Sequence, residues 1–553
     1  MKKIIISTAF FALLVSFLLI LTACTLIDSP CEHLSTTLVK DPEYENESLE
    51  KWNKTCDFCG QVFESFYLPK LDDNPLIFYL LSDGTYEVTC ADNDVSEVVI
   101  PSEYDGIPVT KIAENAFVGC DSLVSVEIPD SVTCIGKNAF MDCNLLKNAT
   151  LSSSLTTIEE SAFYGCTMLG DVTLPNSLTS IGDYAFSGCG SFRNITLPQS
   201  LTSIGDGTFY RCYLLESINI PASVTIIKAY TFKQCSSLES IVIPDSVTSV
   251  GYAAFEGCTS LKNVTISEGV TELGVYSFSN CTSLTDITIP NSVTEIGDMI
   301  LSGCTSLESI SMPCVKKLEL FFDEENKHNL PESLKTVIIT GGEEIFDYAF
   351  SGCETIEKVV ICDGIKKIGM GAFSTCTSLN DVNIPSSVTE IGIFAFHSCS
   401  SLTDIVIPDS VTYLGAASFR ECSSLKNVTL SKNVSTIYDS TFDYCKSLKE
   451  IVIPEGVTKI DLYAFSHCTA LERVVIPDTV TYIGYNAFSC CTSLQSIVIP
   501  NSVTVMIYEV FNYSCNITIY CEAETKPEGW DTGWNFCWAC RGYEDVVWGY
   551  TSE

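Results

Sequence analysis

The sequence predicts a β-rich solenoid, a right-handed superhelix of 23-residue coils with parallel strands, capped at both ends. The pattern V-T-x-I-x-x-x-x-F-x-x-C-x-x-L-x-x-I-x-I-P recurs along most of the chain and stands intact at residues 224–244. Its phenylalanine returns every 23 residues in two runs, and a cysteine follows three positions later. A period of roughly 20 to 29 residues with a short L-x-x-I-x-I core is typical of leucine-rich-repeat solenoids, in which each repeat forms one superhelical turn.

Burial of the repeated aromatic residue would stabilise each coil by about 1.5 to 3 kcal/mol. Its positions are Phe117, Phe140, Phe163, Phe186, Phe209, Phe232, Phe255, Phe278, Leu301, Phe350, Phe373, Phe396, Phe419, Phe442, Phe465, Phe488 and Phe511. The cysteine that follows each position up to Phe488 accounts for 16 of the 29 cysteines. We expect these thiols to be free and buried, because a small apolar side chain suits one inward position and stacked side chains run parallel.

Length and charge narrow the class of protein. A chain of 553 residues would ordinarily form several domains, but coils that contact only their neighbours predict one long solenoid. The formal net charge is −39, from 30 basic and 69 acidic residues. Nucleic acids and anionic membranes attract proteins through lysine and arginine clusters. The composition therefore argues against both as binding partners.

Residues 1–23 predict a lipoprotein signal peptide. Two lysines follow Met1, an apolar run covers residues 4–20, and Leu21-Thr22-Ala23-Cys24 resembles the bacterial lipobox. That resemblance implies that Cys24 is lipid-modified and begins the mature protein. An uncleaved membrane anchor is the alternative, because the apolar run is nearly long enough to span a bilayer. Both alternatives predict a protein tethered outside the cytoplasm. The lipoprotein signal peptide also predicts a lipid anchor in the bacterial cell membrane.

Residues 24–75 are polar and mostly lack the repeat, so we expect a spacer. Cys31, His33, Cys56 and Cys59 within it have the C-x-H and C-x-x-C spacings of a tetrahedral zinc site. A disulfide is the alternative, because an exported chain meets oxidising conditions. No other cofactor is predicted.

The remaining chain divides into an N-terminal cap at 76–101, the solenoid at 102–515 and a C-terminal cap at 516–553. In a typical coil, Ile241 and Ile243 should point inward from a strand, with Ser240 and Val242 outward. The threonine that follows the repeat valine should bond backbone groups at the bend.

The coil at 314–349 is irregular, because 49 residues separate Leu301 from Phe350 where two periods give 46. The extra residues fall in 318–329, where we expect a bulge with exposed aromatic side chains beside acids. Insertions in solenoids map to loops that often contact ligands, and a merely tolerated insertion is the alternative.

Four of the five tryptophans lie in the C-terminal cap, as expected of large side chains that cover the last coil. Cys537 and Cys540 form a C-x-x-C without a thioredoxin-like context. We expect a local disulfide or an isolated pair.

A stripe of small polar residues should line the outer face of the strands, eight positions after the phenylalanine. Ten positions after it runs a stripe of threonine and valine. A continuous strip of this kind is the natural ligand face of a solenoid, and a solvated surface of good strand formers is the alternative. The predicted ligand face comprises Asp171, Asn194, Asn263, Asp286, Ser309, Asp381, Asp404 and Asn427.

The repeat resembles the BspA-type leucine-rich-repeat family of bacterial surface proteins. The resemblance covers about residues 76–550 through I-P-x-S-V-T-x-I-G-x-x-A-F-x-x-C-x-S-L, and residues 520–523 and 547–550 are similar to the ending of such proteins. It implies cell-surface display and binding of host or matrix proteins, or of other cells.

We therefore expect an extracellular adhesion or recognition module that binds a protein or glycan along its strand face. A structural surface-coat protein without a specific ligand is the alternative. An enzyme is not predicted, because no Ser-His-Asp set or carboxylate pair stands out from the repeat. The four histidines are scattered at His33, His328, His397 and His467.

Overall fold

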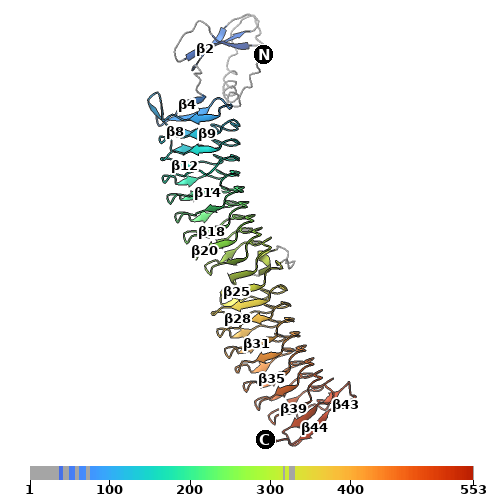
Figure 1. The fold of residues 1–553 in the computed structure, drawn as a ribbon. Coiled ribbons are helices and arrows are strands. Elements are labelled where there is room, and N and C mark those ends of the chain that lie inside the picture. Colours follow the sequence, from blue (N-terminus) through green and yellow to red (C-terminus); the bar gives the residue numbers. More distant parts are fainter. Residues whose placement is uncertain are drawn as a thin grey trace, which may run out of the picture.

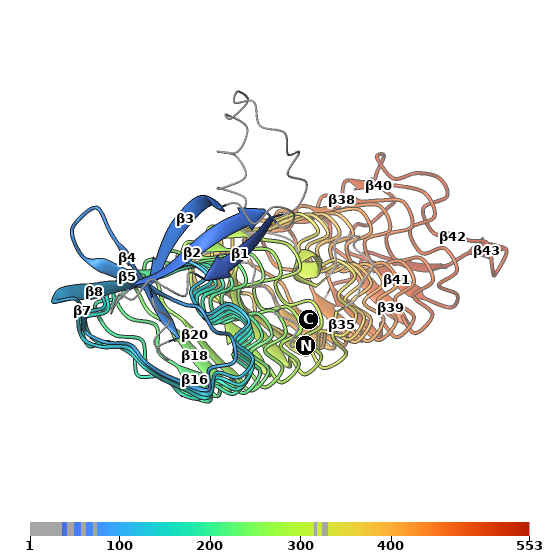
Figure 2. The same cartoon turned by 90° about the horizontal axis from the view of Figure 1, so that it is seen from above.

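The computed structural model describes residues 36–40, 49–56, 62–69, 75–314, 318–322 and 330–551. Figure 1 shows its coils stacked one on another into a long, gently bent rod, and Figure 2 shows the coils superposed in the view from above. The predicted sites at Cys24, Cys31, His33 and Cys59 lie outside the described residues, and Cys56 is described only by its backbone. Within the described ranges, no helix has the length and hydropathy needed to cross a membrane.

The predicted spacer contains a small antiparallel sheet. Its strands are β1 (Thr36–Lys40), β2 (Leu49–Cys56) and β3 (Val62–Pro69), in that order. The solenoid then opens with an antiparallel hairpin, β4 (Leu76–Leu80) and β5 (Tyr86–Cys90), and β5 pairs in parallel with β8 (Ile107–Ile112). The hairpin therefore covers the first parallel strand of the stack.

Each regular coil contributes one strand to each of two parallel sheet systems, except that the coil of Asp171 forms no strand in the first system. We call the outer surface of the first system the strand face. Its strands are β6 (Glu97–Val99), β9 (Ser125–Glu127), β11 (Asn148–Thr150), β14 (Asn194–Ile195), β16 (Ser217–Ile218), β18 (Ser240–Ile243), β20 (Asn263–Ile266), β22 (Asp286–Thr288), β24 (Ser309–Pro313), β25 (Thr336–Gly341), β27 (Lys358–Ile361), β29 (Asp381–Val382), β31 (Asp404–Val406), β33 (Asn427–Thr429), β35 (Glu450–Val452), β37 (Arg473–Val475), β39 (Ser496–Ile499), β41 (Thr518–Cys521) and β44 (Asp545–Trp548).

We call the other system the second sheet. After β5 and β8 its strands are β10 (Cys134–Ile135), β12 (Thr157–Ile158), β13 (Ser180–Ile181), β15 (Ser203–Ile204), β17 (Ile226–Ile227), β19 (Ser249–Val250), β21 (Glu272–Leu273), β23 (Glu295–Ile296), β26 (Glu344–Ile345), β28 (Lys367–Ile368), β30 (Glu390–Ile391), β32 (Tyr413–Leu414), β34 (Thr436–Ile437), β36 (Lys459–Ile460), β38 (Tyr482–Ile483) and β40 (Val505–Met506). β7 (Glu103–Tyr104) pairs antiparallel with β8, and the short strands outside both systems are β42 (Phe536–Cys537) and β43 (Gly542–Tyr543).

The strand register repeats the sequence period. Ser240 pairs with Asn263 on the strand face, and Ile226 pairs with Ser249 in the second sheet, each 23 residues on. Burial alternates along β18, with Ile241 and Ile243 buried and Ser240 and Val242 exposed. The predicted parallel solenoid and its inward isoleucines are confirmed.

The phenylalanines form a buried column in two runs, Phe117 to Phe278 and Phe350 to Phe511, with Leu301 and η2 (Leu318–Phe321) between them. Neighbouring rings stack nearly parallel, with centroids 4.9 Å apart for Phe117 and Phe140 and 5.9 Å apart for Phe186 and Phe209. The repeat cysteines beside them are free and buried, as predicted. The predicted role of the threonines is also confirmed, since Thr179 Oγ1 donates to the carbonyl of Thr156, one coil back, at 3.1 Å.

The turn that carries the phenylalanine uses left-handed backbone on both sides of it. Around Phe232 these residues are Tyr230, with φ of 58°, and Gln234, with φ of 61°. Residues other than glycine rarely adopt this conformation. In other coils glycine takes the second position, as at Gly257, with φ of 75°. Two such residues in each coil turn the chain sharply enough to bury the ring between them.

Phe321 and Phe322 of the irregular coil are buried, which corrects the expectation that its aromatic side chains are exposed. Residues 323–329 of the expected bulge lie outside the described residues. The 3₁₀ helix η2 (Leu318–Phe321) leaves Phe321 fully buried and Phe322 5 % exposed. The backbone N–H of Leu301 donates to the carbonyl of Phe321 at 2.9 Å, and that of Leu318 donates to Ala349 at 3.1 Å. The coil lacks its own A-F-x-x-C turn, so η2 fills that place in the stack.

The parallel ladder continues into the predicted C-terminal cap. β41 pairs with β39 and then with β44, so the stack extends to Trp548. Trp530 and Trp534 are each 3 % exposed, and the Trp534 ring lies 6.3 Å from that of Phe511. These two rings cover the end of the phenylalanine column.

Candidate ligand surface

The predicted polar stripe lies at the start of the strand-face strands. Asn194, Asn263, Asp286, Asp381, Asp404 and Asn427 each begin a strand and are exposed, and Ser309 begins β24 and is half-buried. Strand register places them in one line, because Asp286 pairs with Ser309 and Asp404 pairs with Asn427. The structure therefore aligns the polar residues of successive coils on one surface.

Neighbours in this stripe bond one another. Ser217 Oγ donates to Asn194 Oδ1 at 2.8 Å, and the Asn427 amide donates to the Asp404 carboxylate. Thr403 Oγ1 also donates to Asp404, at 2.6 Å. The bonds from Thr403 and Asn427 lower the pKa of Asp404, so this carboxylate keeps its charge to lower pH than usual.

Two aspartates of the stripe have additional bonds within the protein. Asp171 lies in a coil that forms no strand on the strand face, and its Oδ1 accepts the backbone N–H groups of Arg193 at 2.8 Å and Asn194 at 3.0 Å. This carboxylate takes the place of a backbone acceptor. Asp381 forms an ion pair with Lys358 at 2.7 Å. The stripe therefore links coils as well as facing solvent.

Exposed valines run beside the polar stripe. Val242, Val406 and Val452 are 60 %, 63 % and 55 % exposed, respectively, at the position ten residues after the phenylalanine. These branched side chains stand outward from a regular sheet, where they have good strand propensity. The strand face thus combines an apolar row with a polar row.

Two asparagines interrupt the threonine and valine row. Asn383 Oδ1 accepts the backbone N–H of Ile361 at 2.9 Å, and its Nδ2 donates to the carbonyl of Ile361 at 2.8 Å. Asn219 makes the same pair of bonds to Leu197, at 2.8 and 2.9 Å. Each side-chain amide replaces a peptide group in the ladder. Sequence reasoning missed this role, although the gap in the threonine and valine row marks both positions.

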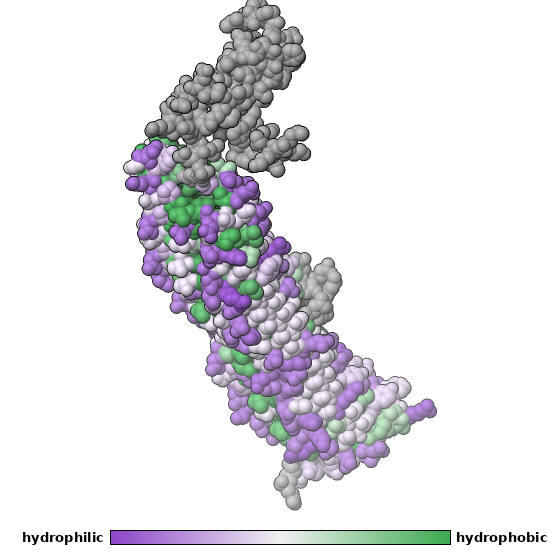
Figure 3. Space-filling model, turned by 45° about the horizontal axis from the view of Figure 1, so that its top comes forward, coloured by the Kyte–Doolittle hydropathy of each residue, from purple (hydrophilic) through white to green (hydrophobic). Residues whose placement is uncertain are grey.

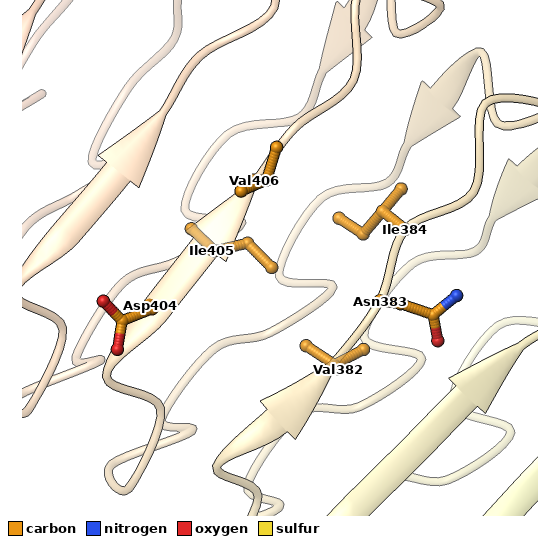
Figure 4. Close-up of a pocket in the computed structure, with 6 residues that line it drawn as sticks. All are labelled: Val382, Asn383, Ile384, Asp404, Ile405 and Val406. Atoms are coloured by element: carbon orange, nitrogen blue, oxygen red, sulfur yellow. The ribbon is translucent and has the colours of Figure 1, made fainter.

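A shallow hollow lies at one of these breaks. β29 ends at Val382 and is not paired with β31, and the space between them is lined by Val382, Asn383, Ile384, Asp404, Ile405 and Val406. Figure 4 shows Asn383 turned away from β31, while Val382 and Ile384 point toward it. A second hollow adjoins the coil of Asp171 and is also lined by Asn148 and Thr150. Two predicted ligand-face residues, Asp171 and Asp404, therefore border depressions in the face.

One histidine lies close to a serine and an aspartate. Ser466 Oγ lies 2.8 Å and Asp443 Oδ1 3.2 Å from the same ring atom, Nδ1 of His467. A nucleophile–base–acid relay requires partners on opposite ring nitrogens. Ser466 is also fully buried, and burial raises the pKa of Asp443. We interpret this cluster as structural.

Hydrophobic residues gather near the N-terminal end of the described rod in Figure 3, whereas hydrophilic residues dominate much of the remaining visible surface. Leu80 and Val99 are 62 % and 66 % exposed in this region. We assign no site to this surface.

The stacked coils and their repeat define a leucine-rich-repeat solenoid. The family model described as a BspA type leucine rich repeat region matches residues 89–214, 202–322, 343–471 and 389–518. The chain belongs to the BspA-type leucine-rich-repeat family, whose members are typically bacterial surface proteins. No match was found among curated proteins.

Solved structures of bacterial repeat proteins are similar to this chain. A leucine-rich repeat protein from Bacteroides ovatus is 27 % identical, over 82 % of this chain and 99 % of that chain, with a TM-score of 0.45. The T. pallidum leucine rich repeat protein is 30 % identical, over 40 % of this chain and 90 % of that chain, with a TM-score of 0.31. A leucine rich cell surface protein from Faecalibacterium prausnitzii is 28 % identical, over 75 % and 95 % of the two chains, with a TM-score of 0.29.

Proposed function

We propose that this protein is an extracellular recognition protein, held at the bacterial cell membrane by a lipid on Cys24, that binds a protein partner through its strand face. The lipobox-like residues 21–24 and the apolar run before them support the anchor. Family membership supports surface display. A rod of stacked coils would carry the binding surface away from the membrane.

The observation that carries the proposal is the pairing of exposed rows on one regular face. Val242 and Val406 offer apolar area, while Asp286, Asp381 and Asp404 offer hydrogen-bond acceptors and negative charge. A protein surface with basic side chains around an apolar centre would complement both rows. Glycan binding is the competing alternative for the same face.

The test compares two triple variants with the same change in charge. Asp286→Lys/Asp381→Lys/Asp404→Lys alters the strand face, and Glu272→Lys/Glu295→Lys/Glu390→Lys alters the second sheet. The sets are matched, because Asp381 pairs with Lys358 and Glu390 pairs with Lys367, so each set breaks one surface ion pair. The wild-type chain and both variants are screened against arrays of extracellular proteins and of glycans.

We expect the wild type and the second-sheet variant to bind the same protein with similar Kd. The strand-face variant should bind it at least about tenfold more weakly, a loss of about 1.4 kcal/mol. Equal binding by all three chains would place the binding surface elsewhere. Binding to glycans alone would replace the protein partner with a glycan. If the wild type binds neither, the proposal fails and a structural coat protein becomes the better account.

A further inference from the structure

Three thiols and a carboxylate meet in the C-terminal cap. Cys515 Sγ lies 3.3 Å from Cys537 Sγ, which lies 3.4 Å from Cys540 Sγ, and Cys540 Sγ lies 3.8 Å from Glu544 Oε1. One donor atom from each of the four residues lies within 4.8 Å of all the others. The cluster brings Cys515, which follows the turn of Phe511, together with Cys537, Cys540 and Glu544, which lie about one coil later in the sequence.

Local structure fixes each member of this group. Cys515 follows the turn of Phe511, and Cys537 ends β42, which pairs antiparallel with β43. The loop between these two strands carries Cys540. Glu544 follows β43 directly, so the hairpin brings its carboxylate back to the thiols.

Glu544 is held in place by its other atoms. Its Oε2 accepts the backbone N–H of Asn516 at 3.1 Å, and its own backbone N–H donates to the carbonyl of Asn535 at 3.0 Å. Asn535 Nδ2 returns a bond to the carbonyl of Glu544 at 3.1 Å. The residue is 8 % exposed, so its charge is largely removed from water. A buried carboxylate needs a compensating charge, and none of these bonds comes from a cationic side chain.

We propose that Cys515, Cys537, Cys540 and Glu544 form a structural Zn²⁺ site. Zinc prefers four sulfur, nitrogen or oxygen ligands in a tetrahedron, with Zn–S bonds of about 2.3 Å, which sets sulfur atoms about 3.8 Å apart. The observed separations need only small shifts to reach this geometry. Binding converts the three thiols to thiolates and releases three protons, so the metal with its three thiolates and one carboxylate carries a net charge of −2.

A disulfide explains the group less well. It would join two sulfurs at about 2.05 Å and leave the third thiol beside them. It would also leave Oε1 of the buried Glu544 carboxylate without a cation beside it. Zinc uses all four side chains and leaves no open coordination position, which is the arrangement of a structural site.

This site would fasten the cap to the solenoid. Cys515 belongs to the last coil, whereas Cys537 and Cys540 belong to the hairpin, so the metal would link the two. The site is separate from the strand face and does not depend on the proposed function. It also differs from the zinc site predicted at Cys31, His33, Cys56 and Cys59.

The experiment uses the full chain with Cys56→Ser, which disables that N-terminal candidate. The protein is reduced, freed of metal and titrated with Co²⁺, which reports tetrahedral thiolate coordination by its absorption spectrum. Cys515→Ser, Cys540→Ser and Glu544→Gln are compared with the control Cys490→Ser, a half-buried cysteine outside the group. Zinc content is measured on the protein as isolated, and Tm is measured with and without Zn²⁺.

We expect one equivalent of Co²⁺ with a thiolate spectrum in the parent chain and in Cys490→Ser, and a rise in Tm with Zn²⁺. Each of the three variants should lose about 10- to 100-fold in affinity, by analogy with the loss of supporting residues at metal sites. The rise in Tm with Zn²⁺ should vanish in Cys515→Ser. The Tm of this variant without metal is the control that the chain still folds. Co²⁺ binding that is unchanged in these variants would overturn the proposal. So would isolated protein that holds no zinc and carries a Cys515–Cys537 or Cys537–Cys540 disulfide.

Discussion

The thiol of Cys258 donates a hydrogen bond to the backbone carbonyl of Phe232 in the preceding coil, with the sulfur 3.2 Å from the oxygen. The same link recurs from Cys143 to Cys304 and from Cys376 to Cys491, with sulfur–oxygen distances of 3.0 to 3.4 Å. In the last coil Ser514 occupies the cysteine position, and its hydroxyl donates to Phe488 at 2.7 Å. The column therefore fills the core and also bonds each coil to the one before it.

Replacing one cysteine of this column should separate the contribution of core packing from that of the hydrogen bond between coils. Cys258→Ala removes both the donor and part of the packing, and we expect it to lower the free energy of unfolding by about 1 to 2 kcal/mol. Cys258→Ser keeps a hydrogen-bond donor at this position, as Ser514 does in the last coil, so it should lower the free energy of unfolding by less. Chemical denaturation followed by circular dichroism measures both, with half-exposed Cys362→Ala as a control that should change little. A serine variant less stable than the alanine variant would contradict a role for the hydrogen bond.

Alkaline pH should weaken the solenoid. Burial raises the pKa of Cys258, Cys304 and Cys422 from 9.0 to about 12. Thiols of the unfolded chain ionise near pH 9, so between pH 9 and 12 the unfolded chain loses protons that the folded chain keeps. The free energy of unfolding should be unaffected by these groups below about pH 9 and should fall as pH rises through this window.

Unfolding midpoints measured from pH 8 to pH 11 test this dependence. Cys258→Ser is the matched control, because a serine hydroxyl does not ionise in this range, and its stability should fall less steeply than that of the wild type. If stability falls equally steeply with pH in the two chains, the buried thiol of Cys258 does not contribute to the pH dependence.

The ring column should tolerate leucine better than alanine. Phe255 is fully buried between Phe232 and Phe278, with centroids 5.2 and 5.3 Å away. Phe255→Ala leaves a cavity and should cost about 3 to 5 kcal/mol. Phe255→Leu should cost clearly less, because Leu301 already fills this position in another coil. Thermal unfolding compares both variants with Tyr252→Ala, a control change at an exposed ring. Equal losses of stability in the alanine and leucine variants of Phe255 would argue against a packing role for the ring.

The ladder amide of Asn383 should also contribute to stability. Asn383→Val removes both bonds to Ile361 and leaves its backbone N–H and carbonyl without that partner, at an expected cost of about 1 to 3 kcal/mol. Thr265→Val is the control, because the backbone of β20 pairs directly with that of β18 there. Hydrogen exchange at Ile361 should quicken in the Asn383 variant, and unchanged protection would show that the amide is dispensable.

The repeat was sufficient to predict the solenoid, the inward isoleucines, the phenylalanine column and the bonds from the threonines. Each depends on a residue type that returns at one position in almost every coil. The sequence did not predict the ladder amides of Asn219 and Asn383, because each is an exception to the pattern. It also misplaced Phe321 and Phe322, which are buried because η2 takes the place of the A-F-x-x-C turn that their own coil lacks.

The cluster of Cys515 and Glu544 illustrates a different limit. The two residues lie 29 positions apart and belong to no shared motif, so only the hairpin of β42 and β43 brings them together. The sheet of β1 to β3 was missed for a related reason, since its strands lack the 23-residue pattern and lie in a polar segment.

Footprinting of the bound complex tests the central claim most directly. The protein is labelled by hydroxyl radicals alone and with the partner captured on the array, and protection is mapped by mass spectrometry. Binding through the strand face predicts protection of Val242, Val406 and Val452, while the exposed rings of Tyr252 and Tyr508 keep their reactivity. Protection of the two tyrosines with the three valines still reactive would contradict it.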